Sequence, residues 1–164
     1  MRLTQQANYS VRILMYCAAK KGQFAKVSEI ARVYDISEYH LFKILPILVS
    51  NGFITTHRGR NGGLQLAKEP ADITLGQIIR AAEENFHLAD CFDEGSYDCP
   101  LLSMCDFNQA LNDALEAFLQ ALDKYTLADL TSREGDIRNL LNIGDKGTNT
   151  ISSDKETTSN ASVS

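Results

Sequence analysis

Apolar residues in the first fifty positions recur at the spacing of helices. Residues 4 to 20 carry one apolar stripe of Tyr9, Ile13, Tyr16 and Cys17, and the glycine of "KKGQ" ends the helix that this stripe predicts. A second, short helix is predicted over "SEIARVYD", with Ser28 as its N-cap. A third runs from an N-cap at Ser37 to Ser50, and its buried face is Leu41, Ile44, Leu45 and Leu48. The pattern predicts a helix–turn–helix preceded by a supporting helix.

The pattern changes after Gly52. The stretch "GFITTHRGRNGGLQLAKEP" predicts two short strands, 53–57 and 64–67, joined by a glycine-rich turn that carries Arg58 and Arg60. Such a hairpin beside a helix–turn–helix is a wing. A further helix follows, and the capping box "TLGQ" predicts its start.

The last apolar pattern lies in the second half of the chain. Spacings of 4, 3, 4 and 3 separate Leu111, Leu115, Phe118, Leu122 and Tyr125, which is the seam of a helix that packs along another long helix. This seam could pack on the chain's own core, but no second helix of that length is predicted. A homodimer is therefore favoured. The Ser-, Thr- and Asn-rich residues after Ile143 predict a disordered tail.

The charge of the chain is divided between its two halves. The overall formal charge is -5, but residues 1 to 80 hold eleven Lys and Arg against five Asp and Glu, a net +6. Residues 81 to 164 hold five Lys and Arg against sixteen Asp and Glu, a net -11. This asymmetry predicts a basic module that binds a polyanion and an acidic module with another role.

Several classes of protein are disfavoured by the sequence. No run of about eighteen apolar residues is present, and "MRLTQQANYS" lacks the apolar stretch of a signal peptide. We therefore expect a cytoplasmic protein with no membrane partner. The chain has no Gly-rich phosphate loop and no Ser-His-Asp set at recognisable spacing, so we do not expect an enzyme.

Three cysteines lie close together in the acidic stretch "DCFDEGSYDCPLLSMC", with the spacing C-x7-C-x5-C. Thiolates are soft ligands that select zinc or iron–sulfur clusters. Three of them are sufficient for a cubane cluster whose last iron binds another ligand or solvent. Two alternatives stay open, a closed zinc site completed by His87 and a thiol switch without metal. Cys17 lies on an apolar helix face and is expected to be a core residue.

The predicted winged helix–turn–helix places its DNA contacts at two points. The second helix of the pair would enter the major groove by its N-terminal end, and the wing would contact the flanking backbone or the minor groove. The candidate DNA-binding residues are Ser28, Ser37, Glu38, Tyr39, His40, Lys43, Arg58, Arg60, Asn61 and Gly62.

These segments together resemble a known family. "MRLTQQANYSVRILMY", "SEIARVYDIS", "HLFKIL", "RGRNGG" and the cysteine loop are similar to the Rrf-type winged-helix transcription regulators over about residues 1 to 142. That family includes the iron–sulfur cluster assembly regulator, the nitric-oxide-sensitive repressor and the rhizobial iron regulators, and "ADCF" with "DCPLLSMC" most resembles the last group.

The resemblance implies a homodimeric repressor of iron-uptake genes that binds double-stranded operator DNA and has no small-molecule substrate. It also implies a 4Fe–4S cluster on Cys91, Cys99 and Cys105, whose decay can pass through a 2Fe–2S form. Asn108 stands where the cluster assembly regulator has a histidine ligand, and Asn8 stands near the position of an aspartate in the nitric-oxide sensor type. The fourth ligand therefore stays open, as does sensing of nitric oxide or redox state instead of iron.

The predicted fold is mainly α with a small β-wing. A winged helix–turn–helix DNA-binding domain would occupy residues 1–80 and a cluster-binding loop region residues 81–105. A dimerisation helix and a C-terminal helix would occupy 106–142, and the disordered tail 143–164.

Overall fold

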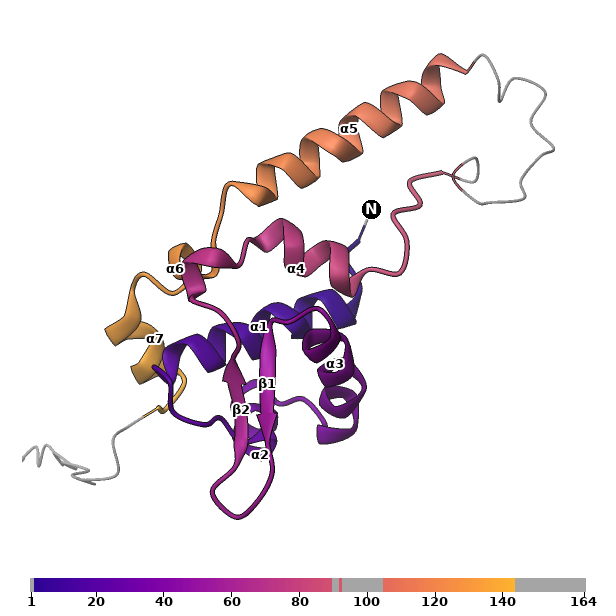
Figure 1. Ribbon diagram of the computed structural model, residues 1–164. Coiled ribbons are helices and arrows are strands. Elements are labelled where there is room, and N and C mark those ends of the chain that lie inside the picture. The colour runs from indigo at the N-terminus through magenta and orange to yellow at the C-terminus, as the bar shows by residue number, and fades with distance from the viewer. Residues whose placement is uncertain (1, 90–91, 93–104, 144–164) are drawn as a thin grey trace, which may run out of the picture.

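The computed structural model describes residues 2–89, 92 and 105–143. The elements of the first half are α1 (Gln5–Ala19), α2 (Val27–Tyr34), α3 (Glu38–Ser50), β1 (Ile54–His57) and β2 (Gly63–Leu66). They are followed by the 3-10 helix η1 (Pro70–Asp72), α4 (Leu75–Ala82), α5 (Asp106–Asp123), α6 (Leu127–Leu130) and α7 (Glu134–Leu140). The mainly helical fold with a two-stranded wing is confirmed (Figure 1).

Side-chain caps begin most of the helices where the sequence predicts them. The Thr4 side chain accepts from the Ala7 N–H at the start of α1, and Ser37 caps α3 in the same way. Thr74 and Gln77 form the predicted capping box of α4. Gly52, which follows the end of α3, has a φ of +67°, a conformation that glycine adopts without strain.

The predicted start of α2 is wrong. Its N-cap is Lys26, and Ser28 lies in the first turn. The reason is the carboxylate of Glu29, which accepts from the Lys26 N–H at 3.3 Å and from the Tyr16 hydroxyl at 3.4 Å, and pairs with Lys20 at 2.9 Å. The contacts with Tyr16 and Lys20 fix α2 to α1, and α2 begins two residues earlier than a cap at Ser28 would place it.

The wing is short and joined to the core. β1 pairs antiparallel with β2 from Ile54 opposite Leu66 to His57 opposite Gly63. Ala25, from the connection between α1 and α2, exchanges backbone hydrogen bonds with Leu64 of β2 at 2.9 and 2.8 Å. This third extended segment fixes the base of the wing beside the helix–turn–helix.

One core holds α1, α2, α3, β1 and α4 together. Its largest fully buried side chains include Ile13, Leu14, Ile30, Leu41, Leu48, Ile54, Ile73, Ile78 and Leu127. Leu127 comes from α6, so the chain after α5 returns to the half that holds the helix–turn–helix. Within the described residues, no helix is long and apolar enough to cross a membrane.

The long helix α5 packs on this body over only part of its length. Leu119 is its only buried residue among those described, and it joins Ala7, Ile79 and Ala82 in a second apolar cluster. Leu115, Phe118 and Leu122 of the predicted seam pack against that cluster while partly exposed. The other half of α5 extends as an arm beyond α4 (Figure 1). The seam thus partly packs on the chain's own α1 and α4, the option that the sequence disfavoured, while the homodimer stays a prediction.

Candidate nucleic-acid interface and cysteine loop

The N-terminal end of α3 presents a polar, exposed surface on a buried apolar base. Leu41, Ile44 and Leu45 are buried against the core, as predicted. The four candidate base-reading residues Glu38, Tyr39, His40 and Lys43 are all exposed. α3 packs on α1, α2, α4 and β1, which together fix its orientation.

Two contacts order the exposed side chains of this end. The Ser37 hydroxyl lies 3.0 Å from Nδ1 of His40 and accepts the His40 backbone N–H at 3.4 Å. The ammonium of Lys43 lies 4.4 Å from the centroid of the Tyr39 ring, one helical turn away. Such contacts restrict the rotamers of long side chains before any ligand binds.

The turn of the wing carries the predicted basic residues at the surface. Arg58, Arg60 and Asn61 are exposed. Gly62 is partly buried, and a Cβ at this position would collide with the carbonyl oxygen of His57. Gly62 therefore shapes the turn that carries the arginines, and any backbone contact of its own with DNA stays a prediction.

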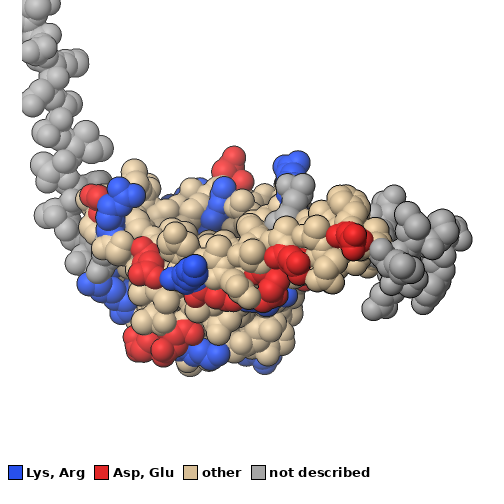
Figure 2. Space-filling view, turned by 90° about the horizontal axis from the view of Figure 1, so that it is seen from above, with Lys and Arg blue, Asp and Glu red and all other residues tan. Residues whose placement is uncertain are grey.

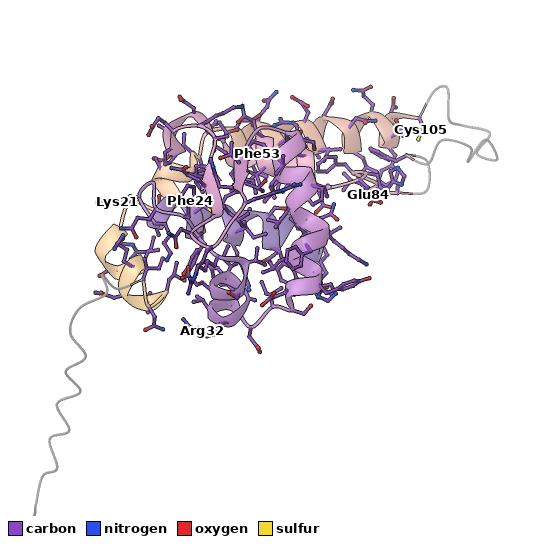
Figure 3. All side chains as sticks on the ribbon, turned by 60° about the horizontal axis from the view of Figure 1, so that its bottom comes forward. Lys21, Phe24, Arg32, Phe53, Glu84 and Cys105 are labelled. Atoms are coloured by element: carbon purple, nitrogen blue, oxygen red, sulfur yellow. The ribbon has the colours of Figure 1, made fainter. Side chains whose placement is uncertain are left out.

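The face of α2 adds one residue that the sequence analysis omitted. Ser28 is exposed in the first turn, and Arg32 is exposed one turn later (Figure 3). The i, i+4 spacing of Ser28 and Arg32 was the signal that could have added Arg32 to the candidate set. An exposed arginine on the first helix of the helix–turn–helix is suited to a phosphate contact.

The link between α1 and α2 is electrostatically stable at neutral pH. Burial, followed by the carboxylate of Glu29, raises the pKa of Tyr16 to about 12. Burial alone would raise the pKa of Glu29, but hydrogen bonds from Lys20 and Lys26 outweigh it and lower that pKa. Glu29 therefore stays ionised and Tyr16 neutral, which keeps the contact intact.

Cys105 lies at the start of α5 and is the one cysteine of the acidic loop within the described residues. It is the N-cap of the helix, and its Sγ accepts the Asn108 N–H at 3.4 Å. The sulfur therefore lies at the positive end of the helix dipole. The partly buried Cys105 lies at the end of the arm, far from α2 (Figure 3).

The remaining predicted ligands, Cys91 and Cys99, lie outside the described residues. Among the residues that are described, no three His, Cys, Asp or Glu side chains gather as a metal site. Cys105 supplies a soft, half-exposed donor at a helix N-terminus, which fits the ligand type of an iron–sulfur cluster. Its role in holding one stays a prediction.

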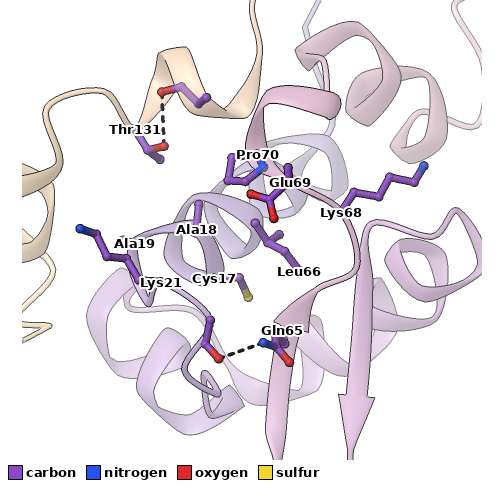
Figure 4. A pocket seen from close by; sticks show the side chains of 12 residues that line it. Cys17, Ala18, Ala19, Lys21, Gln65, Leu66, Lys68, Glu69, Pro70 and Thr131 are labelled. Atoms are coloured by element: carbon purple, nitrogen blue, oxygen red, sulfur yellow. Dashed lines mark hydrogen bonds between the residues drawn. The ribbon is translucent and has the colours of Figure 1, made fainter.

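Cys17 occupies a different environment. It is 3% exposed on α1, and burial raises the pKa of its thiol to about 12. It borders a cavity of about 510 Å³ whose wall includes the side chain of Gln65, which donates to the Gly22 carbonyl at 2.9 Å (Figure 4). The prediction that Cys17 is a core residue is confirmed.

The long helix α5 carries acidic but no basic side chains. The sequence of α5 contains Asp106, Asp113, Glu116 and Asp123 but no Lys or Arg. Figure 2 shows acidic side chains along the arm. An acidic arm repels the DNA backbone, so the basic first half is the better candidate for DNA contact.

Comparisons with known proteins agree with this geometry. Residues 3–133 match the model of the Rrf2 family, described as an iron-dependent transcriptional regulator. The chain is 46% identical to Protein aau3 of Rhizobium meliloti over 87% of its length and 93% of that protein. It is 44% identical to the HTH-type transcriptional regulator NsrR of Geobacillus kaustophilus, covering 86% of this chain and 97% of that one.

Solved structures give the same fold. CymR, the global cysteine regulator of B. subtilis, aligns with a TM-score of 0.60 at 26% identity, over 81% of this chain and 98% of that one. IscR of T. potens aligns with a TM-score of 0.65 at 23% identity, over 84% and 91% of the two chains. The fold of this chain is therefore the winged helix of these regulators.

Proposed function

We propose, because the chain belongs to the Rrf2 family of transcriptional regulators, that it is an iron-responsive repressor. In this proposal a cytoplasmic homodimer loaded with a 4Fe–4S cluster binds the operators of iron-uptake genes and releases them when the cluster is lost. Transcriptional regulators of this family act by binding DNA rather than as enzymes.

The observation that carries the proposal is the first turn of α3. There an exposed polar set lies directly over a buried apolar face, and a wing with two exposed arginines stands beside it. This is the arrangement in which a recognition helix reads the major groove and a wing contacts the flank. The net charge of +6 in residues 1 to 80 gives it the electrostatic attraction that operator binding requires.

The iron dependence rests on the cysteine loop and its connection to α5. Cys105 both ends the predicted ligand set and caps α5, so whatever holds its sulfur also fixes the first turn of that helix. Cys91, Cys99 and Cys105 would hold the cluster, which when bound supplies an iron centre that is lost as iron becomes scarce. Three cysteines leave one iron of the cluster without a protein ligand. That iron would be the one most easily lost, which suits a sensor better than an electron carrier.

The homodimer is supported by the exposed half of α5. Phe107 is 63% exposed there, and Leu111 of the seam is only partly buried. A second copy would cover these side chains and hold two recognition helices at one spacing across a two-fold axis. Loss of the cluster would free the acidic loop, and repulsion between its carboxylates would then loosen that spacing.

The free-energy difference that such a switch requires is moderate. To change the ratio of DNA-bound to free protein from 99:1 to 1:99, the cluster must favour the DNA-binding form by about 5.5 kcal/mol. Structural zinc sites couple metal binding to folding by about 10–16 kcal/mol, which is larger than this requirement. The cluster could therefore switch the regulator without any other effector.

The deciding experiment combines anaerobic native mass spectrometry with gel-shift titration of iron-uptake promoter DNA. We expect a dimer whose mass includes a 4Fe–4S cluster, tight operator binding, and release that follows cluster decay under an iron chelator. Replacing Cys91, Cys99 or Cys105 by Ala should abolish both cluster and binding, while the control Cys17→Ala keeps both. Iron-free protein that binds as tightly as the loaded form would overturn the proposal.

The alternative is a nitric-oxide- or redox-sensing repressor of the same family. The partly exposed sulfur of Cys105 favours it, because direct oxidation of a cysteine requires access to the oxidant. In the same titration, release by nitric oxide or peroxide but not by chelator would select this alternative. A colourless, zinc-containing dimer would reject both.

A further inference from the structure

We propose that His40 is a specificity-determining residue that reads a purine acceptor through its Nε2–H, in a tautomer set by Ser37. The inference rests on the DNA-binding part of the proposed function and is independent of the cluster. Its basis is the pair of contacts that Ser37 makes with one residue at the start of α3.

The Ser37 hydroxyl engages His40 twice. It accepts the backbone N–H of His40 at 3.4 Å, as an N-cap side chain does, and lies 3.0 Å from Nδ1 of the same residue. A hydroxyl has one proton and two lone pairs, so it can accept from the backbone and donate to the ring simultaneously. With that assignment, one hydroxyl satisfies both contacts.

The position of the ring favours this direction of the hydrogen bond. Nδ1 faces the first turn of α3, where unpaired backbone N–H groups form the positive end of the helix dipole. A lone pair on Nδ1 is favoured in that field and an N–H is disfavoured. Nδ1 therefore accepts from Ser37, and the ring proton lies on Nε2.

In the neutral ring, this tautomer presents Nε2–H as a donor at the surface. His40 is exposed, so Nε2–H is available to a ligand at the end of α3 that enters the groove. Among the base-edge groups of the major groove, N7 of a purine and O6 of guanine accept such a donor. The neighbouring side chains present other chemistry, because Glu38 is an acceptor and Lys43 lies over Tyr39.

A neutral donor affects discrimination more than general affinity. It attracts no phosphate, so its contribution appears only where a matching acceptor stands opposite it. Ser37 is a positioning residue in this scheme, because it acts through the orientation and proton of His40. The scheme therefore predicts a loss of discrimination on changing either residue.

The first test measures the tautomer without DNA. Nitrogen-15 NMR of the full chain above pH 8, where histidine is neutral, should show a proton on Nε2 of His40 and a bare Nδ1. Ser37→Thr keeps the hydroxyl and should keep this state, while Ser37→Ala should shift His40 toward a mixture of tautomers. A proton on Nδ1 in the wild type would overturn the proposal.

The second test uses DNA duplexes that the wild-type chain selects from a random pool. Single purines are replaced by their 7-deaza forms, which lack N7, and binding is measured by competition. We expect one position in each half-site where the replacement weakens wild-type binding about fivefold to tenfold, the size of one hydrogen bond. His40→Ala should bind both duplexes equally, and Ser37→Ala should retain only part of the discrimination.

The two failures are distinguishable. If no duplex is selected, DNA binding itself is rejected and the inference falls with it, whatever the tautomer. If duplexes are selected but no 7-deaza position matters, or His40→Ala keeps the sensitivity, the reading by His40 is wrong while the proposed function stands. Binding that ignores iron leaves this test unaffected.

Discussion

The guanidinium of Arg80 forms two hydrogen bonds of 2.7 Å with the two carboxylate oxygens of Asp123. This fork joins α4 of the DNA-binding half to the last turn of α5, whose first turn begins at Cys105. Thr74, the N-cap of α4, also donates to Asp123 at 3.3 Å. The helix α5 therefore runs without a break from Cys105, the last of the predicted cluster ligands, to the contact with α4.

This junction should transmit the state of the loop to the recognition helix. We expect Arg80→Ala to bring the operator affinities of loaded and iron-free protein closer together, because α5 is no longer fastened to α4. Arg80→Lys keeps the charge but not the fork and should be intermediate. Gel-shift titration measures the ratio of the operator affinities of loaded and iron-free protein. A ratio equal to that of wild type would show that the Arg80–Asp123 contact does not transmit the state of the loop.

The same contact predicts a pH dependence. The hydrogen bonds from Arg80 hold the pKa of Asp123 below its usual value. A carboxyl whose folded-state pKa is lowered stabilises the fold above its unfolded pKa, and this contribution is lost as pH falls through the lower folded value. Chemical unfolding between pH 7 and pH 3 should therefore show a smaller loss of stability in Asp123→Asn than in wild type.

Gly76 should be required for the close approach of α4 and α5. A Cβ on Gly76 would collide with Oδ1 and Cγ of Asp123, and would lie 2.8 Å from Arg80 Nη1. Gly76→Ala should destabilise the fold by about 1–3 kcal/mol, as overpacking does. Gly135→Ala in α7 is the matched control, because nothing lies within 4 Å of its new Cβ. Urea unfolding that gives equal changes for both would contradict the prediction.

The elements predicted correctly from the sequence are those specified by neighbouring residues. α3 has its cap, its apolar spacing and its glycine end within sixteen residues, and α4 has a complete capping box. The start of α2 was missed because Glu29 acts through Lys20 and Tyr16 of another helix. The local sequence around Ser28 does not reveal a contact between two helices.

The same limit explains the seam of α5. Its spacing predicts an apolar face but not what covers it, since α4 is too short to receive the whole helix. The tertiary position of α4 places Leu119, which the seam omitted, deepest in the contact. For the candidate site, the exposure of the polar residues on α3 was predictable from its apolar spacing, while their DNA contacts stay a prediction. The Ser37–His40 and Tyr39–Lys43 contacts depend on side-chain rotamers and were not predictable.

Arg60 of the wing should contribute affinity without specificity. If it contacts a phosphate, Arg60→Ala weakens binding to all duplexes by a similar factor and reduces the salt slope by about one ion. Lys124→Ala, an exposed cation after α5, should leave the slope unchanged. The measurement is a titration of operator and random DNA at several salt concentrations. An unchanged slope for Arg60→Ala would exclude the phosphate contact.

Cys17 should react much more slowly than Cys105 in the folded chain. Burial raises its pKa to about 12, so its reactive thiolate is scarce at neutral pH. Iodoacetamide added to iron-free protein at pH 8 should label Cys105 well before Cys17, as followed by peptide mass spectrometry. In urea the difference should vanish, and early labelling of Cys17 in the folded chain would contradict its core position.

Substitutions in the two halves of α5 should affect folding and dimerisation separately. Leu119 is buried against α1 and α4, so Leu119→Ala should cost about 2–5 kcal/mol of unfolding free energy. Phe107 is 63% exposed on the arm, so Phe107→Glu should leave the fold of one chain intact. If a second copy covers the arm, the same change should weaken the dimer strongly, because a carboxylate would be buried among acidic residues. Sedimentation equilibrium with urea unfolding measures both properties. A Phe107→Glu protein that dimerises like wild type would show that the arm is not the interface, and the half-site spacing would then require another origin.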